Sequence, residues 1–245
     1  MAKPLVSAIM TVYNGEKFVE ESLQSLLMQD FRDFEVGIIL DGCTDNTEKI
    51  VSRVMNNFPG SFFISIKRSK EGISARRNEL VERAEGKYIA IQDADDISFP
   101  NRFSKEVEYL NENPDVFCIG SWVINIDEEG NDIRVSNYPP ENHVDITKMV
   151  IEDCRNPIMD PTTMFRKKDF LELGGYSTDK EIWTVPDFDL WLRAISARKK
   201  FHNFQEPLIK YRINSKGVTR SKKMLMIQHH MRAWKKFKAQ SRLKR

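Results

Sequence analysis

The sequence predicts an α/β fold in which helices flank a mixed, mainly parallel central sheet. Short apolar and β-branched runs alternate with helical patterns over the first 115 residues. This alternation is typical of a doubly wound sheet, because neighbouring parallel strands need a crossover connection between them. The chain has 245 residues, of which 40% are hydrophobic, so it can bury the core that such a sheet requires.

Strands and helices are expected to alternate strictly in the first half of the chain. The strands are expected at 6–14, 34–40, 61–67 and 87–92. The helices are expected at 16–29, 48–57, 72–86 and 100–110. Val19, Leu23 and Leu26 fall on one face of the first helix. Pro100 stands near the first turn of the last one, where proline is well tolerated.

The pattern changes after residue 115. Apolar runs at 116–126 and 132–138 bracket the turn-like segment DEEGND, which predicts a hairpin. Further strands are expected at 161–167 and 200–213, with a helix at 187–197. The sequence contains no repeat, low-complexity segment or linker, so we expect residues 1–215 to form one globular body.

The last thirty residues differ from the rest in charge. Residues 216–245 contain 11 Lys and Arg residues and no acid, whereas the first 215 residues carry 27 basic and 36 acidic residues. Apolar side chains recur in this tail at helical spacing, which predicts a basic amphipathic helix. These side chains are Met224, Ile227, Met231, Trp234 and Phe237.

This predicted C-terminal helix has two interpretations. It either contacts an anionic membrane surface or packs its apolar stripe onto the acidic body. Nucleic-acid binding is less favoured, because aromatic and basic residues interleave only in this short segment.

Composition favours a cytoplasmic protein. No stretch approaches the roughly 20 apolar residues that cross a bilayer, and the N-terminal residues do not resemble a secretory signal. The three cysteines, Cys43, Cys118 and Cys154, show no close spacing that suggests a disulfide or a metal site.

Polar side chains stand at the ends of the predicted parallel strands, where open α/β sheets bind ligands. Thr11 and Tyr13 end the first strand, and Asp41 ends the second. Tyr13 can stack on a planar base and Asp41 can accept a hydrogen bond from one. The alternatives are an aromatic at the core edge for Tyr13, and turn and N-cap chemistry for the segment DGCTDNT.

Three aspartates follow the fourth strand in the segment IQDADDIS. Hard oxygen ligands at this spacing suit Mg²⁺ or Mn²⁺, and a bound cation would relieve the repulsion between Asp93 and Asp95. Asp96 is then expected to cap the turn that leads to Pro100. The alternative is that all three are loop acids around a helix start.

The chain lacks the glycine-rich phosphate loops of dinucleotide-binding and P-loop proteins. The phosphates of a bound nucleotide must therefore be neutralised by a metal and by side chains. Arg76 and Arg77 are candidates, because a guanidinium matches phosphate oxygens in bidentate fashion. We expect one of these two arginines to lie on a solvated helix face instead.

Several segments together resemble family 2 glycosyltransferases, the inverting enzymes of GT-A fold that use nucleotide-sugar donors. The similar segments are VSAIMTVYN, LDGCTDNT, EGISARRNELVERAEGKYIAIQDADDISFPNR, PTTMFRKKDFLELGGYS, PDFDLWLR and PLIKYRIN. They occur in the order typical of the family and cover about residues 5–215. The resemblance implies a GT-A fold with a nucleotide-sugar-binding half at 1–115 and an acceptor-binding half at 116–215.

The resemblance also implies roles on the donor side. Tyr13 and Asp41 would hold the nucleobase, usually uracil in this family, and Thr11 would line the same pocket. Arg77, rather than Arg76, matches the arginine of the family's A-R-N pattern. Asp93 would lie near the ribose or the metal.

On the metal and acceptor side, the resemblance implies that Asp95, with Asp93, binds Mn²⁺ or Mg²⁺. Asp187 would be the general base that takes the proton of the acceptor hydroxyl. Trp183 and Trp191 flank that segment and are candidates for packing against a sugar ring, although Trp191 fits a core position equally well.

The sequence departs from the family pattern at several positions. Asn214 stands where a histidine often helps to bind the metal, and Asp160 where histidine is common. Thr11 stands in place of a frequent proline, and Pro186 in place of the first acid of the family's E-D motif.

We therefore expect an inverting, metal-dependent glycosyltransferase that takes a UDP-sugar, with a dTDP- or GDP-sugar as the alternative donor. The acceptor is expected to be a glycan or a lipid-linked saccharide in bacterial surface-polysaccharide synthesis at the inner membrane face. A homodimer is compatible with the sequence. The alternative from another class is a non-catalytic nucleotide-sugar or carbohydrate-binding module on the same fold.

Overall fold

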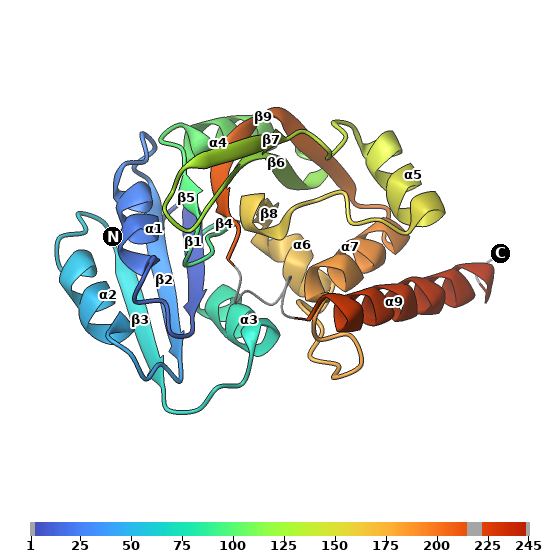
Figure 1. Cartoon of the computed structure of the whole chain (residues 1–245). Helices are drawn as coiled ribbons and strands as arrows, with labels where there is room; N and C mark the ends of the chain where they lie inside the picture. The colour runs from blue at the N-terminus through green and yellow to red at the C-terminus, as the bar shows by residue number, and fades with distance from the viewer. Residues whose placement is uncertain (1–2, 215–221, 244–245) are drawn as a thin grey trace.

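A nine-stranded sheet forms the centre of the computed structural model, which describes residues 3–214 and 222–243 (Figure 1). The strands are β1 (Val6–Val12), β2 (Phe34–Asp41), β3 (Phe62–Lys67), β4 (Tyr88–Ile91), β5 (Ile97–Ser98), β6 (Val116–Ile126), β7 (Asp132–Ser136), β8 (Met164–Arg166) and β9 (Lys200–Arg212). Their order in the sheet is β3-β2-β1-β4-β8-β6-β9-β5, and β7 pairs with β6.

The sheet is parallel in its first half and mixed in its second. Strands β3, β2, β1 and β4 all run parallel. Strand β8 then pairs antiparallel with both β4 and β6, while β6 and β9 are parallel. The predicted mixed, mainly parallel sheet is thus observed. The β6–β7 hairpin is also observed, and it closes on the turn around Gly130.

Helices flank the sheet on both faces (Figure 1). They are α1 (Val19–Leu27), α2 (Thr47–Met55), α3 (Ile73–Arg83), α4 (Arg102–Glu112), α5 (His143–Asp153), α6 (Lys167–Glu172), α7 (Pro186–Ser196) and α9 (Lys223–Leu243), with a short 3-10 turn η1 (Asp160–Thr162). Helix α1 begins three residues later than expected, because residues 14–18 form a loop. There the backbone amides of Gly15 and Glu16 donate to Thr47 and Asp45.

The core has one layer on each face of the sheet, as the alternation along β1 requires. Ala8 and Met10 point to a layer that α1, α2 and α4 cover. Ile9 points to the opposite layer, which α3 and α7 cover. Trp191 of α7 is fully buried in this second layer, with its ring 5.9 Å from that of Phe201.

The described part of the basic tail is helix α9, which lies against α7 at the end of the molecule opposite α2 (Figure 1). Ala233 and Phe237 are buried against Val150 and Phe188, and the Trp234 indole N–H donates to the Val150 carbonyl at 3.1 Å. Met224, Ile227 and Met231 stay exposed. The predicted stripe therefore divides between two helix faces. Residues 216–221 and 244–245 lie outside the described residues.

Candidate functional site

The parallel register brings the ends of β1, β2 and β4 to one edge of the sheet. Thr11 pairs with Ile39 of β2, and Ile9 pairs with Ile91 of β4. The strand-end side chains singled out in the sequence therefore emerge side by side.

Asp41 is buried at the end of β2 and is held by the start of α3. Its carboxylate accepts hydrogen bonds from the backbone amides of Glu71 and Gly72, and from Arg76 Nε at 2.7 Å. Burial alone would raise the pKa of Asp41, but these hydrogen bonds outweigh it and hold the pKa below the usual value. Asp41 is thus a fixed carboxylate at neutral pH.

Both arginines of α3 are buried, so the expectation that one lies on a solvated face is wrong. Arg76 is 5% exposed and Arg77 is 4% exposed. Arg76 is enclosed because it serves Asp41, whereas Arg77 points toward the aspartates of the site.

Tyr13 is 48% exposed, and one face of its ring carries the Lys70 ammonium, 3.3 Å from the ring centroid. Lys70 was not anticipated from the sequence, because nothing in a lone loop lysine indicates a partner 57 positions away. Nearby in the chain, the Thr11 hydroxyl is buried and has no hydrogen-bond partner among the described residues. A buried orphan hydroxyl is an available group for a ligand.

Arg77 links three parts of the chain. Its guanidinium pairs with Asp93 at 2.6 Å and with Asp160, and Tyr176 donates its hydroxyl to Asp160 at 2.9 Å. The adjacent carboxylates raise the pKa of Arg77 even though burial opposes this. Burial raises the pKa of Asp160 to about 6 despite the charge of Arg77. The aspartate that replaces the family's common histidine is therefore the buried partner of Arg77.

Asp93 and Asp95 lie in the turn after β4 and are both partly exposed. Burial, together with the neighbouring charge of Asp93, raises the pKa of Asp95 to about 6. The Asn214 side chain hydrogen-bonds to Asp95 and acts in the opposite direction. Two repelling carboxylates and an amide form an oxygen-rich donor set that fits a hard divalent cation whose other ligands are phosphates and water. Within the described residues, no group of three or more His, Cys, Asp or Glu side chains gathers to hold a metal alone.

Asp96 does not cap the turn toward Pro100, contrary to expectation. It is 1% exposed, and its Oδ1 accepts from the Arg212 backbone amide at 2.8 Å. Arg212 also donates to the Asp95 carbonyl at 2.9 Å and pairs with Glu21. Asp96 and Arg212 thus fasten the aspartate turn to the end of β9.

Asp187 lies in the first turn of α7, where the helix dipole stabilises a negative charge. Asn156 Nδ2 donates to its Oδ2 at 2.6 Å. Burial raises the pKa of Asp187, and the hydrogen bond from Asn156 and the charge of Arg77 offset this only in part. The charge of Arg77, which pairs with Asp93, thus also acts on the Asp187 carboxyl.

The two tryptophans differ in position. Trp183 is 39% exposed, and the Lys222 ammonium lies 5.6 Å from its ring centroid. Trp191 is fully buried among Phe117 and Phe201, so it belongs to the core and cannot contact an acceptor. The core interpretation of Trp191 is the correct one.

Comparison with known proteins gives a consistent result. The model of glycosyl transferase family 2 matches residues 7–174. The uncharacterized glycosyltransferase MJ1057 of Methanocaldococcus jannaschii is 34% identical over 236 residues, which cover 94% of this chain and 79% of that protein. The O-antigen biosynthesis glycosyltransferase WbnJ of Escherichia coli is 31% identical over 222 residues, with coverage of 89% and 83%.

Solved structures show the same fold. A fragment of S. aureus TarS in complex with UDP superposes with a TM-score of 0.70 at 18% identity, covering 96% of this chain and 70% of that one. The mannosyltransferase PcManGT from Pyrobaculum calidifontis, in complex with GDP-Man and Mn²⁺, gives 0.70 at 17% identity, covering 95% and 65%. At these identities the likeness establishes the GT-A fold. Together with the family match and the 34% identity, it shows that this chain belongs to glycosyl transferase family 2.

Proposed function

We propose that this glycosyltransferase moves a sugar from a nucleoside diphosphate donor, most simply a UDP-sugar, to a hydroxyl of a saccharide acceptor, with inversion. The arrangement around Arg77 is the observation that carries this proposal. Its ion pairs join Asp93 of the aspartate turn to Asp160 of the second half, and its charge acts on the Asp187 carboxyl. On this proposal residues 1–115 bind the donor and residues 116–215 bind the acceptor.

Inversion requires the acceptor hydroxyl to attack the anomeric carbon opposite the departing diphosphate. Asp187 takes the hydroxyl proton, and burial, which raises its pKa, makes it a stronger base than an exposed aspartate. Asp95 and Asp93, with Asn214, would hold Mn²⁺ or Mg²⁺, which would supply positive charge to stabilise the leaving diphosphate. Arg77 holds Asp93 in place from the buried side.

The nucleobase stacks on the exposed ring of Tyr13 in this proposal. The Thr11 hydroxyl offers it a hydrogen bond, and Asp41 fixes the loop before α3 beside it. Two neighbours of the same fold were solved with different nucleotides, UDP and GDP-Man. A UDP donor is therefore the proposal to test against GDP and dTDP.

Relatives named for O-antigen and amylovoran biosynthesis support a role in surface-polysaccharide synthesis. We place the reaction at the cytoplasmic face of the membrane, with a glycan or lipid-linked saccharide as acceptor. Among the described residues, no helix is long and apolar enough to span a bilayer. A peripheral contact would instead use the exposed Met224, Ile227 and Met231 of α9, whose basic neighbours suit anionic lipids.

Calorimetric titration tests the donor side. UDP, GDP and dTDP are titrated with and without Mn²⁺ into wild type and Asp95→Ala. We expect UDP to bind about tenfold more tightly with Mn²⁺, which is about 1.4 kcal/mol, and this gain to vanish in Asp95→Ala. Failure of every nucleotide to bind would overturn the proposal.

Turnover is tested with Asp187→Asn and the matched control Asp189→Asn, which removes an acid from the same helical turn. Asp189 pairs with Arg193 and has no place in the proposed reaction. The rate of sugar transfer should fall by about 100- to 10,000-fold in Asp187→Asn and stay unchanged in Asp189→Asn. UDP binding should be unchanged in both variants. Unchanged function in Asp187→Asn would favour a non-catalytic binding module.

A further inference from the structure

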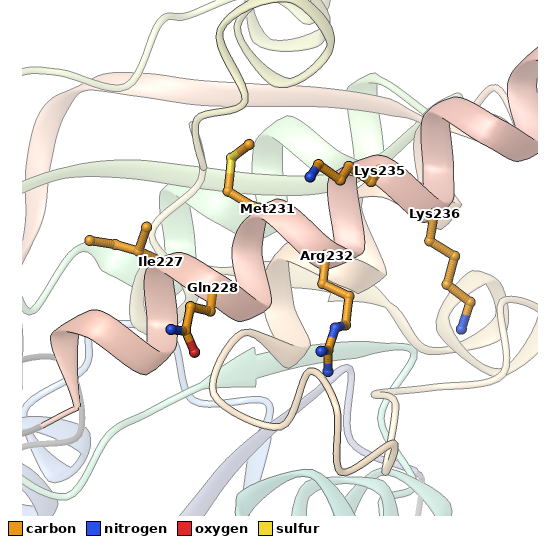
Figure 2. Close-up of a pocket in the computed structure, with 6 residues that line it drawn as sticks. All are labelled: Ile227, Gln228, Met231, Arg232, Lys235 and Lys236. Atoms are coloured by element: carbon orange, nitrogen blue, oxygen red, sulfur yellow. The ribbon is translucent and has the colours of Figure 1, made fainter.

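A groove runs between α9 and the segments on either side of α5, with a volume of about 900 Å³. We call it the α9 groove. It is lined by Tyr138, Cys154, Arg155, Asn156, Lys223, Met226, Ile227, His230 and Met231. A second hollow, of about 690 Å³, is lined by α9 alone. Figure 2 shows its side chains spread along the helix, and none of the acids of the proposed site lines it. Of these two hollows, the α9 groove is the one with a lining residue, Asn156, that contacts a proposed site acid.

The α9 groove reaches the proposed base through one residue. Asn156 lines the groove and donates to Asp187 at 2.6 Å. The Asn156 backbone is itself fixed, because the Tyr138 hydroxyl donates to its carbonyl at 2.9 Å. A molecule in the groove would thus lie one side chain away from Asp187.

The lining has a cationic part. Arg155 and Lys223 are exposed, and neither has a carboxylate within ion-pair distance among the described residues. Arg155 lies over the Tyr138 ring, 4.3 Å from the centroid, which fixes its position without neutralising it. Two cations that lack acidic partners favour an anionic ligand group.

The lining also has an apolar part and one available polar atom. Met226, Ile227 and Met231 form the α9 wall, and Ile227 is 50% exposed while Met231 is 41% exposed. The His230 ring stacks on the Phe188 ring, with 3.6 Å between the ring centroids. The buried Nε2 of His230 has no hydrogen-bond partner within the part of the chain that is described. An apolar wall beside unpaired cations is the complement of an amphiphile with an anionic head.

We propose that the α9 groove is the aglycone site of the acceptor, and that the acceptor is an anionic amphiphile. Its phosphate lies between Arg155 and Lys223, its apolar chain lies along Ile227 and Met231, and its sugar hydroxyl reaches Asp187 past Asn156. This inference rests on the proposed function, because it assumes that Asp187 faces an acceptor. A neutral glycan is the competing occupant.

Binding of simple probes tests the charge requirement without knowledge of the natural acceptor. Decyl phosphate, decyl maltoside and inorganic pyrophosphate are titrated calorimetrically into the full chain, with the amphiphiles below their micelle concentrations. We expect decyl phosphate to bind at least about tenfold more tightly than either other probe, since only it satisfies both parts of the lining. Equal or tighter binding of decyl maltoside would overturn the proposal in favour of a neutral glycan.

Matched variants locate the binding. Arg155→Ala with Lys223→Ala should weaken decyl phosphate binding at least about tenfold, whereas Arg232→Ala with Lys236→Ala, which removes the same charge from the other hollow, should change it less than about twofold. Ile227→Ser should weaken binding, and Met224→Ser, on the same helix but outside the groove, should not. Equal effects of test and control variants would mean nonspecific attraction and would refute the site.

Different results would refute the proposed function and the aglycone site. Titration of UDP with Mn²⁺ should be unchanged in all four variants, because among the described residues no hydrogen bond or ion pair joins the varied side chains to the proposed donor-side residues. Loss of UDP binding in wild type would remove the proposed function. Decyl phosphate binding that ignores the groove variants would remove only the aglycone site.

Discussion

At the residue scale, Asn156 lies outside every motif of the sequence but orients Asp187, which lies inside one. Its Nδ2 donates to Asp187, and its Oδ1 accepts from the Ile158 amide at 3.3 Å, so both ends of the amide are engaged. The orientation of the proposed base therefore depends on a residue 31 positions earlier in the chain.

We predict that Asn156→Ala shifts the acidic limb of the transfer rate to higher pH. The hydrogen bond from Asn156 favours the ionised form of Asp187, so its removal raises the pKa of Asp187 further. Less of the base is then ionised at a given acidic pH. In a plot of kcat against pH, the acidic limb should move to higher pH by up to about one pH unit. The value of kcat on the alkaline plateau should fall by about tenfold or less. A lower kcat with an unmoved profile would show that Asn156 acts only on packing.

The sequence locates the candidate site residues but not their partners. Asp41, Asp93, Asp95 and Asp187 stand at element ends that apolar patterning locates well. Asp160 was noticed only as a departure from the family pattern, and its ion pair with Arg77 spans 83 positions. Such pairings depend on strand order, in which β8 lies beside β4, and no local pattern encodes that order.

At the element scale, the strands were predictable because parallel strands buried on both faces form continuous apolar runs. The elements that escaped prediction are short or weakly patterned. Strand β5 has two residues and exists because Ile97 and Ser98 pair with β9. Helix α5 buries only Ile146 and Val150, although Asn142 caps it by accepting from the Asp145 amide.

Helix α9 is the element whose face could not be chosen from the sequence. Its apolar residues are too many for one stripe, so two faces compete, and the position of α7 decides which is buried. We predict that Phe237→Ala lowers the free energy of unfolding by about 3 kcal/mol, because it opens a cavity against Val150 and Phe188.

The control for this packing is Met224→Ala, which removes a large side chain that is 70% exposed on the same helix. It should change the free energy of unfolding by less than about 0.5 kcal/mol in urea denaturation. Equal small effects of Phe237→Ala and Met224→Ala would mean that α9 does not pack on the body in solution.

At the scale of the whole molecule, both halves contribute buried acids with raised pKa values, and one of these acids, Asp160, pairs with Arg77 of the other half. Asp95 and Asp160 have pKa values raised to about 6, and that of Glu106 is raised to about 7, in each case chiefly by burial. Glu106 pairs with Arg102, whose guanidinium also donates to the carbonyls of Ile91 and Thr163. Residues 1–115 and 116–214 thus meet at buried acids whose pKa values are raised, and Arg77 and Arg102 make the contacts across.

These raised pKa values predict that the metal-free protein is more stable at pH 5.5 than at pH 8. Each acid binds its proton more tightly in the folded state than in the unfolded one. Its stabilising contribution is therefore complete below the unfolded pKa of about 4 and is lost as the pH rises through 6 to 7. Burial lowers the pKa values of His143, His202 and His230, which reduces stability below about pH 6.5 and opposes this effect. The free energy of unfolding in urea should therefore fall by on the order of 1 kcal/mol between pH 5.5 and pH 8.

Addition of Mn²⁺ with UDP separates the contribution of Asp95 to this pH dependence from the contributions of Asp160 and Glu106. A cation bound to its carboxylate favours the ionised form, so the fall in stability with pH should become smaller in wild type. In Asp95→Asn the fall should be smaller from the outset, and Mn²⁺ with UDP should not change it. A stability that rises from pH 5.5 to pH 8 without metal would contradict the buried, protonated acids on which this prediction depends. The two halves would then be joined by carboxylates that stay ionised.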